Sequence, residues 1–136
     1  MKKQFSILIF LISVFLISCS TSKNVKFISN SLVGKWEFQS LTITNDSNES
    51  AISNIMQNSV LEFGKDNSFN FKIAGFERNG VWTLGQKGRA LILGYEKTKN
   101  NKRLKTFDII EVSETNFVWN YYFDGKNIEL TYKKIQ

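Results

Sequence analysis

The fold is decided by a stretch near the C-terminus, Asn116–Lys133, whose sequence is NFVWNYYFDGKNIELTYK. Aromatic residues occupy every second position before the Asp124-Gly125 pair, and apolar residues do so after it. An alternation of period two is typical of a strand with one buried face. An Asp-Gly pair between two such segments is a strong signal for a tight hairpin turn. The stretch therefore predicts two adjacent antiparallel strands.

The same pattern continues upstream. Short alternating segments are separated by turn residues, and each is predicted to be a strand. In the first of them, the apolar positions change parity after Phe38, which indicates a β-bulge or bend near Ser40. The helical spacing of Ile52, Ile55 and Met56 predicts a short helix of about three turns after this strand. The eight predicted strands are Val33–Thr44, Val60–Phe63, Ser68–Ile73, Gly80–Leu84, Ala90–Tyr95, Leu104–Val112, Asn116–Phe123 and Ile128–Lys133.

Eight strands joined by short turns predict an all-β fold, an antiparallel up-and-down barrel with one short helix after the first strand. An open meander would leave two unpaired edges and an uncovered apolar face, and closure removes both. A β-sandwich is the alternative architecture. The interior of an eight-stranded barrel is either filled by side chains or holds one small ligand.

The composition excludes several classes of function. The 136 residues contain no His, no Pro and one Cys. Without His, neither a Ser-His-Asp triad nor a Cys-His pair can form, and one Cys allows no intrachain disulfide. The carboxylates are scattered, with Asp66 at a turn and with Asp108 and Glu111 at positions of opposite parity. We therefore expect no enzyme activity, no metal site and no cofactor.

The N-terminus has the features of an export signal. Lys2 and Lys3 precede 13 mostly apolar residues, Phe5–Ile17, which are too few for a typical membrane-spanning helix. The following residues, Leu16-Ile17-Ser18-Cys19, resemble the lipobox of bacterial lipoproteins, in which the cysteine becomes the lipidated first residue. The resemblance implies a signal peptide over residues 1–18 and acyl chains such as palmitate on Cys19. The alternative is an uncleaved anchor with a free cysteine.

The residues after Cys19 bear on the destination of the protein. Ser20 resembles the pattern of lipoproteins sorted to the outer membrane, and no acidic run for surface export follows it. We expect a lipid-anchored protein on the periplasmic face of the outer membrane. Residues 19–31 are predicted to be a polar tether and residues 32–136 the barrel domain. Removal of residues 1–18 would take away Lys2 and Lys3 and lower the net charge from +6 to +4. This mild basic excess favours solubility or contact with anionic lipid over nucleic-acid binding.

The chain also resembles the lipocalin and lipocalin-like superfamily, and in particular the lipocalin-like lipoprotein domains of Gram-negative bacteria. The residues that carry the resemblance are Gly34-Lys35-Trp36, which match the Gly-x-Trp of the first barrel strand, and the run Leu61–Phe69. A second Gly-x-Trp occurs at Gly80-Val81-Trp82. The resemblance implies that the tryptophan closes the base of the barrel. The family's Thr-Asp-Tyr motif and its C-terminal Arg are absent, but Lys133 or Lys134 can replace the Arg through a cation–π contact.

The residues predicted to line the barrel follow from strand parity alone. An aromatic interior suits an apolar or planar ligand, although aromatic residues also dominate ordinary cores. A mostly filled core is the alternative. The predicted lining residues are Trp36, Phe38, Phe69, Phe71, Trp82, Leu91, Leu93, Trp119, Tyr121 and Tyr132.

Two hypotheses for function remain open at this level. In the first, the barrel binds a small hydrophobic molecule without chemistry. In the second, a filled barrel contacts or inhibits another envelope protein. Tyr122, on the second face of its strand, is a candidate protein contact. A basic hairpin, which is either a solvated tip or a contact for lipid head groups or an acidic partner, contains Lys97, Lys99, Lys102, Arg103 and Lys105.

Overall fold

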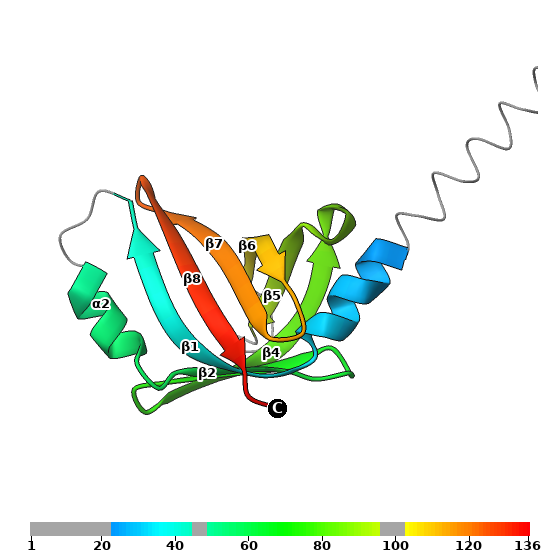
Figure 1. The fold of residues 1–136 in the computed structure, drawn as a ribbon, viewed down its shortest axis with the longest axis horizontal. Coiled ribbons are helices and arrows are strands. Elements are labelled where there is room, and N and C mark those ends of the chain that lie inside the picture. The colour runs from blue at the N-terminus through cyan, green and yellow to red at the C-terminus, as the bar shows by residue number, and fades with distance from the viewer. Residues whose placement is uncertain (1–22, 45–48, 96–102) are drawn as a thin grey trace, which may run out of the picture.

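The computed structural model describes residues 23–44, 49–95 and 103–136. Eight antiparallel strands follow one another around a closed barrel, and the predicted fold class is confirmed (Figure 1). The order of elements is β1 (Gly34–Ile43), α2 (Glu49–Met56), β2 (Val60–Phe63), β3 (Ser68–Ile73), β4 (Phe76–Gly85), the 3-10 turn η1 (Gln86–Gly88), β5 (Ala90–Tyr95), β6 (Arg103–Val112), β7 (Asn116–Phe123) and β8 (Lys126–Lys134).

The pairing of β1 with β8 closes the barrel. It extends over seven register positions, from Trp36 opposite Lys134 to Ile43 opposite Ile128. The register shifts between Phe38 and Ser40, so the bulge predicted near Ser40 is present. The extra residue reverses the parity of the strand, and Phe38 and Leu41 therefore both point into the core.

Two hairpins at the same end of the barrel, β3–β4 and β7–β8, each have a tight two-residue turn. Asp124 and Gly125 both have positive φ, at 49° and 76°, as a two-residue type I′ turn requires. Ala74 and Gly75 also have positive φ between β3 and β4. After this second turn, β4 begins at Phe76, four residues before the predicted start, because residues 76–79 pair with β3.

A second helix, which the sequence did not indicate, precedes the barrel. Residues 23–32 are helical, whereas residues 19–31 were expected to be a tether. Leu32 is completely buried in the core, and Ile28 packs against it. Burying a leucine side chain contributes roughly 2 kcal/mol, which helps to explain why this polar segment is ordered. Figure 1 shows this helix and α2 on opposite sides of the barrel.

The helix 23–32 is attached to the barrel through its last carbonyl groups. The indole N–H of Trp36 donates to the carbonyl of Leu32 at 2.8 Å, and the ammonium group of Lys134 donates to the carbonyl of Ser31 at 2.9 Å. The same ammonium group lies 4.9 Å from the centre of the Trp36 ring, so the predicted cation–π contact is made by Lys134. A cation at a helix C-terminus also interacts favourably with the helix dipole. We call the end of the barrel where these groups meet the closed end.

We predict that the substitution Lys134→Met lowers the free energy of unfolding by about 1 to 2 kcal/mol, because it removes a charge-assisted hydrogen bond and a cation–π contact while keeping the aliphatic stem. Lys133→Met is the matched control, since Lys133 is exposed on the other face of β8. Urea unfolding of both variants measures the difference. Equal losses in the two variants would contradict the role assigned to Lys134.

Candidate functional site

The interior of the barrel contains the residues predicted to line it. Two of the ten, Phe71 and Tyr121, are half-buried and pack against the core. The other eight are at most 6% exposed: Trp36, Phe38, Phe69, Trp82, Leu91, Leu93, Trp119 and Tyr132. Period-two alternation thus placed all ten on the inner face, because short twisted strands keep their parity unless a bulge intervenes.

Several interior residues were absent from that prediction. They are apolar, at most 8% exposed, and belong to the same cluster: Leu32, Leu41, Ile43, Leu61, Phe63, Phe107, Phe117 and Leu130. Phe117 shares the parity of Trp119 and could have been found from it. Phe107 is on β6, where a bulge between Ile109 and Glu111 obscures the alternation.

The β6 bulge also corrects the expectation that Asp108 and Glu111 face opposite sides. Asp108 pairs with Asn120 and Glu111 pairs with Val118, both of which lie on the outer face of β7 because Trp119 points inward. The two carboxylates therefore share the outer face. The inserted residue at the bulge, Ile110, is exposed.

Aromatic rings form a continuous network across the middle of the barrel. Trp119 stacks on Phe107 with a centroid distance of 4.4 Å and meets Tyr132 edge-on at 5.8 Å. Phe117 links Trp36, at 5.7 Å, to the same group of rings. Such contacts contribute about 0.5 to 1.5 kcal/mol each beyond the burial of their area. The network extends from the closed end into the middle of the barrel.

The opposite end, where β1 ends and the β7–β8 hairpin turns, is built differently, and we call it the open end. Its inward-facing side chains are only half-buried, including Phe71, Tyr95 and Tyr121. The guanidinium group of Arg78 lies 5.8 Å from the Tyr95 ring, and the ammonium group of Lys105 lies 5.3 Å from the Tyr121 ring. Burial raises the pKa of the Tyr95 phenol, while Arg78 lowers it and Tyr121 raises it. The mouth thus combines aromatic faces with two cations.

Of the basic hairpin, only part can be placed. Lys97, Lys99 and Lys102 lie outside the described residues. Arg103 and Lys105 are exposed, and Lys105 contacts Tyr121 as described above. Arg78, which the sequence did not single out, is the second cation of the mouth. Its inward position could have been predicted from strand alternation, because Arg78 and Trp82 are an even number of residues apart and so lie on the same face of the strand.

The rim of the open end exposes large apolar side chains. Phe76 follows the β3–β4 turn and is 75% exposed, while Tyr122 and Phe123 precede the β7–β8 turn and are 72% and 60% exposed. The exposure of Tyr122 agrees with its prediction as an outward-facing residue. A surface depression of about 300 Å³ lies beside the β3–β4 hairpin, lined by Asn58 and residues 72–77.

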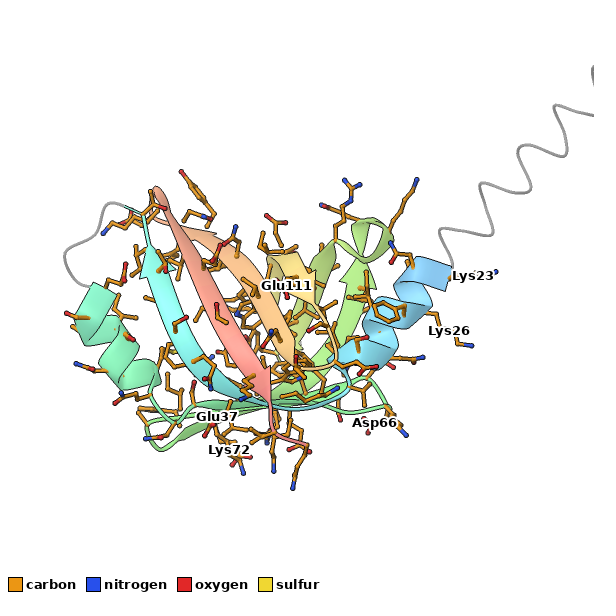
Figure 2. All side chains as sticks on the ribbon, in the orientation of Figure 1. Lys23, Lys26, Glu37, Asp66, Lys72 and Glu111 are labelled. Atoms are coloured by element: carbon orange, nitrogen blue, oxygen red, sulfur yellow. The ribbon has the colours of Figure 1, made fainter. Side chains whose placement is uncertain are left out.

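The charged side chains outside the barrel have local structural roles. Asp66 accepts hydrogen bonds from the backbone N–H and the hydroxyl of Ser68, which lower its pKa and fix the β2–β3 turn, as expected for turn chemistry. Figure 2 shows Glu37, Asp66 and Glu111 on separate parts of the molecule. Within residues 23–44, 49–95 and 103–136, no group of three or more metal-ligating side chains is close enough to hold a metal ion.

The architecture is that of a lipocalin-like barrel, and solved structures share it. A lipocalin-like protein from Bacteroides uniformis superposes with a TM-score of 0.56 at 14% sequence identity, covering 77% of this chain and 99% of that one. An uncharacterized protein from Bacteroides eggerthii gives 0.55 at 15% identity, with coverages of 76% and 99%. A DUF4847 family protein from Bacteroides vulgatus gives 0.50 at 12% identity, with coverages of 77% and 96%. At these identities the likeness concerns the fold alone.

No family model matches the sequence, and no curated protein is similar to it. The predicted signal peptide, residues 1–18, and the predicted lipidation site, Cys19, lie outside the described residues. Among the helices that the structure does describe, none has the length and apolar character needed to cross a membrane.

The deeply buried Tyr132 leads to a prediction about pH. Burial raises the pKa of its phenol well above the usual value of 10.0, although the Ser59 hydroxyl acts in the opposite direction. Above pH 10 the unfolded chain releases this proton while the folded chain retains it, so stability falls as pH rises. We expect the free energy of unfolding to fall by about 1 kcal/mol between pH 10 and 11 from this residue, with the slope approaching about 1.4 kcal/mol per pH unit at higher pH.

The measurement is urea unfolding at several alkaline pH values. Tyr132→Phe should remove that part of the slope, whereas Tyr122→Phe, the same chemical change at an exposed position, should leave it in place. A wild-type slope retained in Tyr132→Phe would show that another group causes the alkaline loss.

Proposed function

We propose that the barrel binds a small hydrophobic molecule at its open end, reversibly and without chemical change. One observation carries the proposal: the two ends of the barrel differ in burial. At the closed end Trp36, Phe63 and Phe117 are at most 1% exposed, whereas the inward-facing Tyr95 and Tyr121 at the open end remain half-buried. Apolar surface at the mouth of a concave barrel gains free energy when a ligand covers it.

The composition of the mouth supports this proposal and limits the kind of ligand. Aromatic faces offer large apolar areas with little side-chain entropy to lose. The described part of the interior contains no His and no Cys, so binding by packing and hydrogen bonds accounts for its residues better than acid/base or redox chemistry. The lipocalin-like fold of the structural neighbours is compatible with the same role.

The lipid anchor belongs to the same proposal. We infer that Cys19 is acylated after removal of residues 1–18, and that Ser20 directs the protein to the periplasmic face of the outer membrane. Cys19 is four positions before Lys23, a reach of at most roughly 14 Å. Because helix 23–32 packs on the closed end, the anchor would hold that end near the bilayer. The open end, where α2 lies beside the end of β1, would then face away from the bilayer (Figure 1).

The rim favours a second candidate function, an interaction module of the cell envelope. Phe76, Tyr122 and Phe123 are large, apolar and at least 60% exposed at two hairpin tips. Exposed aromatic residues of this kind often mark protein contacts. In this alternative the packed interior only supports the rim, and a protein partner covers the exposed rings.

Neighbouring tyrosines distinguish the two functions. Tyr121 points into the mouth and Tyr122 points outward, so Tyr121→Ala and Tyr122→Ala make the same chemical change on opposite faces. If the barrel binds a ligand, Tyr121→Ala should weaken binding about tenfold, from the loss of buried aromatic area, and Tyr122→Ala should not. Native mass spectrometry of the full chain, isolated from its own membranes, measures the bound small molecule.

The opposite pattern supports the interaction module. In that case wild type and Tyr121→Ala carry no small molecule, and Tyr122→Ala alone loses an envelope protein that co-purifies with wild type. A ligand retained equally by both variants would contradict the assignment of the mouth.

The anchor has its own test. Radiolabelled palmitate should be incorporated into the wild-type protein and not into Cys19→Ala, because the thiol is the acceptor of the acyl-bearing group. Ser18→Ala is the control at the adjacent position and should still be labelled. Labelling that persists in Cys19→Ala would contradict lipidation at this residue.

A further inference from the structure

Among the residues that the structure describes, three polar atoms in the interior of the barrel have no hydrogen-bond partner. They are the hydroxyl of Ser59, the indole nitrogen of Trp119 and the hydroxyl of Tyr132, on residues that are 0%, 5% and 0% exposed. A fourth unpaired atom, the side-chain oxygen of Asn120, lies on the outer face of β7 and is separate from them. An unmet buried polar group costs about 1 to 3 kcal/mol, so native structures satisfy nearly all of them.

Of the three tryptophans, only Trp119 has an indole N–H without an acceptor. The indole N–H of Trp36 donates to the carbonyl of Leu32 at 2.8 Å, and that of Trp82 donates to the carbonyl of Gly64 at 3.2 Å. Both acceptors are at the closed end, supplied by helix 23–32 and by the β2–β3 turn. Trp119 sits in the middle of the barrel, where the surrounding side chains are apolar or aromatic.

The three unpaired atoms belong to one region of the core. The rings of Trp119 and Tyr132 meet edge-on at a centroid distance of 5.8 Å. The Tyr132 ring also meets Phe38 at 5.9 Å, and the backbone N–H of Phe38 donates to the carbonyl of Ser59. The Ser59 hydroxyl is close enough to lower the pKa of the Tyr132 phenol, although the two are not in hydrogen-bond geometry. Strands β1, β7 and β8 and the residue before β2 thus bring the three atoms together.

The chemistry of the three groups defines what they can bind. An indole N–H only donates, and the two hydroxyl groups can donate as well as accept. Among the described residues, the rings that contact Trp119 and Tyr132 include those of Phe38, Phe107 and Phe117, which carry no charge. The two cations of the mouth lie against the Tyr95 and Tyr121 rings instead. A buried carboxylate or phosphate would therefore lack the charge partner that it needs in this region. A neutral oxygen atom suits the donors without that cost.

We propose that Ser59, Trp119 and Tyr132 form a polar subsite that binds the carbonyl or hydroxyl oxygen of a neutral, otherwise apolar ligand. This inference rests on the proposed function, because it assigns a deep contact to the ligand that enters through the mouth. The apolar part of the ligand lies among the aromatic residues toward the open end. The subsite selects neutral oxygen-bearing molecules over hydrocarbons, which cannot accept a hydrogen bond. It also selects them over anions, for which its three groups supply no positive charge.

The test uses the full chain in lipid nanodiscs, with ¹⁵N-labelled tryptophan and 2-nonanone as the probe. Each of the three tryptophans gives one indole N–H resonance, and Trp119→Phe identifies the resonance of Trp119. On addition of 2-nonanone, the Trp119 proton should move downfield as it gains an acceptor. The indole N–H groups of Trp36 and Trp82 already donate to carbonyl groups. Their resonances are the internal controls for non-specific effects, such as partition of the probe into lipid.

Two further probes define the selectivity. n-Nonane has nearly the same apolar chain but no hydrogen-bond acceptor. Nonanoate at pH 8 has an ionised carboxylate as its acceptor. We expect both to bind at least tenfold more weakly than 2-nonanone, with no downfield shift at Trp119.

Conservative variants locate the contact. Tyr132→Phe and Ser59→Ala remove single hydroxyl groups and should weaken 2-nonanone binding five- to tenfold while leaving binding of n-nonane unchanged. Tyr122→Phe makes the same change as Tyr132→Phe on the exposed outer face of β7 and should leave both affinities unchanged. The thermal midpoint of the ligand-free protein should not fall in Tyr132→Phe, because the lost hydroxyl has no partner there.

The outcomes separate this inference from the proposed function. Equal affinities for 2-nonanone and n-nonane, unaffected by Tyr132→Phe, overturn the subsite and leave hydrophobic binding standing. Binding of none of the three probes overturns both. A lower thermal midpoint in Tyr132→Phe with unchanged ketone affinity indicates an ordered water as the partner of the hydroxyl and also overturns the subsite.

Discussion

The structure depends on the pairing between β1 and β8, which joins the first and last strands of the chain. Without it the meander would end in two open edges, and its aromatic face would be exposed to water. The β-bulge at Gln39 makes this closure compatible with a buried face on both halves of β1. Trp36 and Phe38 point inward before the bulge, and Leu41 and Ile43 do so after it. One inserted residue therefore allows both halves of β1 to contribute side chains to the same core.

Closure also makes the two ends of the barrel different. At one end Trp36 and Lys134 hold the last carbonyl groups of helix 23–32, and Leu32 completes the core beneath them. The pKa of Lys134 is lowered by burial, with Glu114 acting in the opposite direction, which reflects how closely this cation is packed. At the other end, connections as short as two residues leave the inward-facing aromatic residues partly exposed. The difference between the closed end and the open end thus follows from the position at which helix 23–32 packs on the barrel.

A sealed end, a half-buried aromatic mouth and unpaired donors between them are the features on which the proposed binding role rests. The donors of the closed end already have acceptors, whereas those of Ser59, Trp119 and Tyr132 do not. The carboxylates discussed above, such as Asp66, Asp108 and Glu111, lie at a turn and on outward-facing strand positions and do not converge on the interior (Figure 2). The arrangement therefore suits recognition by apolar contact and hydrogen bonding.

Much of the fold could be predicted from local pattern. Alternation fixed the faces of Phe69, Phe71, Trp119 and Tyr132, and the Asp124-Gly125 turn fixed a hairpin register, because both signals depend only on neighbouring residues. The change in parity after Phe38 even located the bulge. The bulge in β6 escaped detection because LKTFDIIEV has apolar residues at both parities.

The local pattern of the sequence was enough to predict the eight strands, the inner faces of most of them and the turns between them, since these are properties of neighbouring residues. Only the tertiary structure decided that residues 23–32 form a helix, because its stability comes from Leu32 entering a core built by distant strands. It also decided which indole nitrogens find acceptors. Trp36 and Trp82 obtain theirs from other segments that pack against them, and Trp119, with the same local strand pattern, is left without one. Hydrogen-bond satisfaction is a property of what lies opposite a side chain, which strand periodicity does not specify.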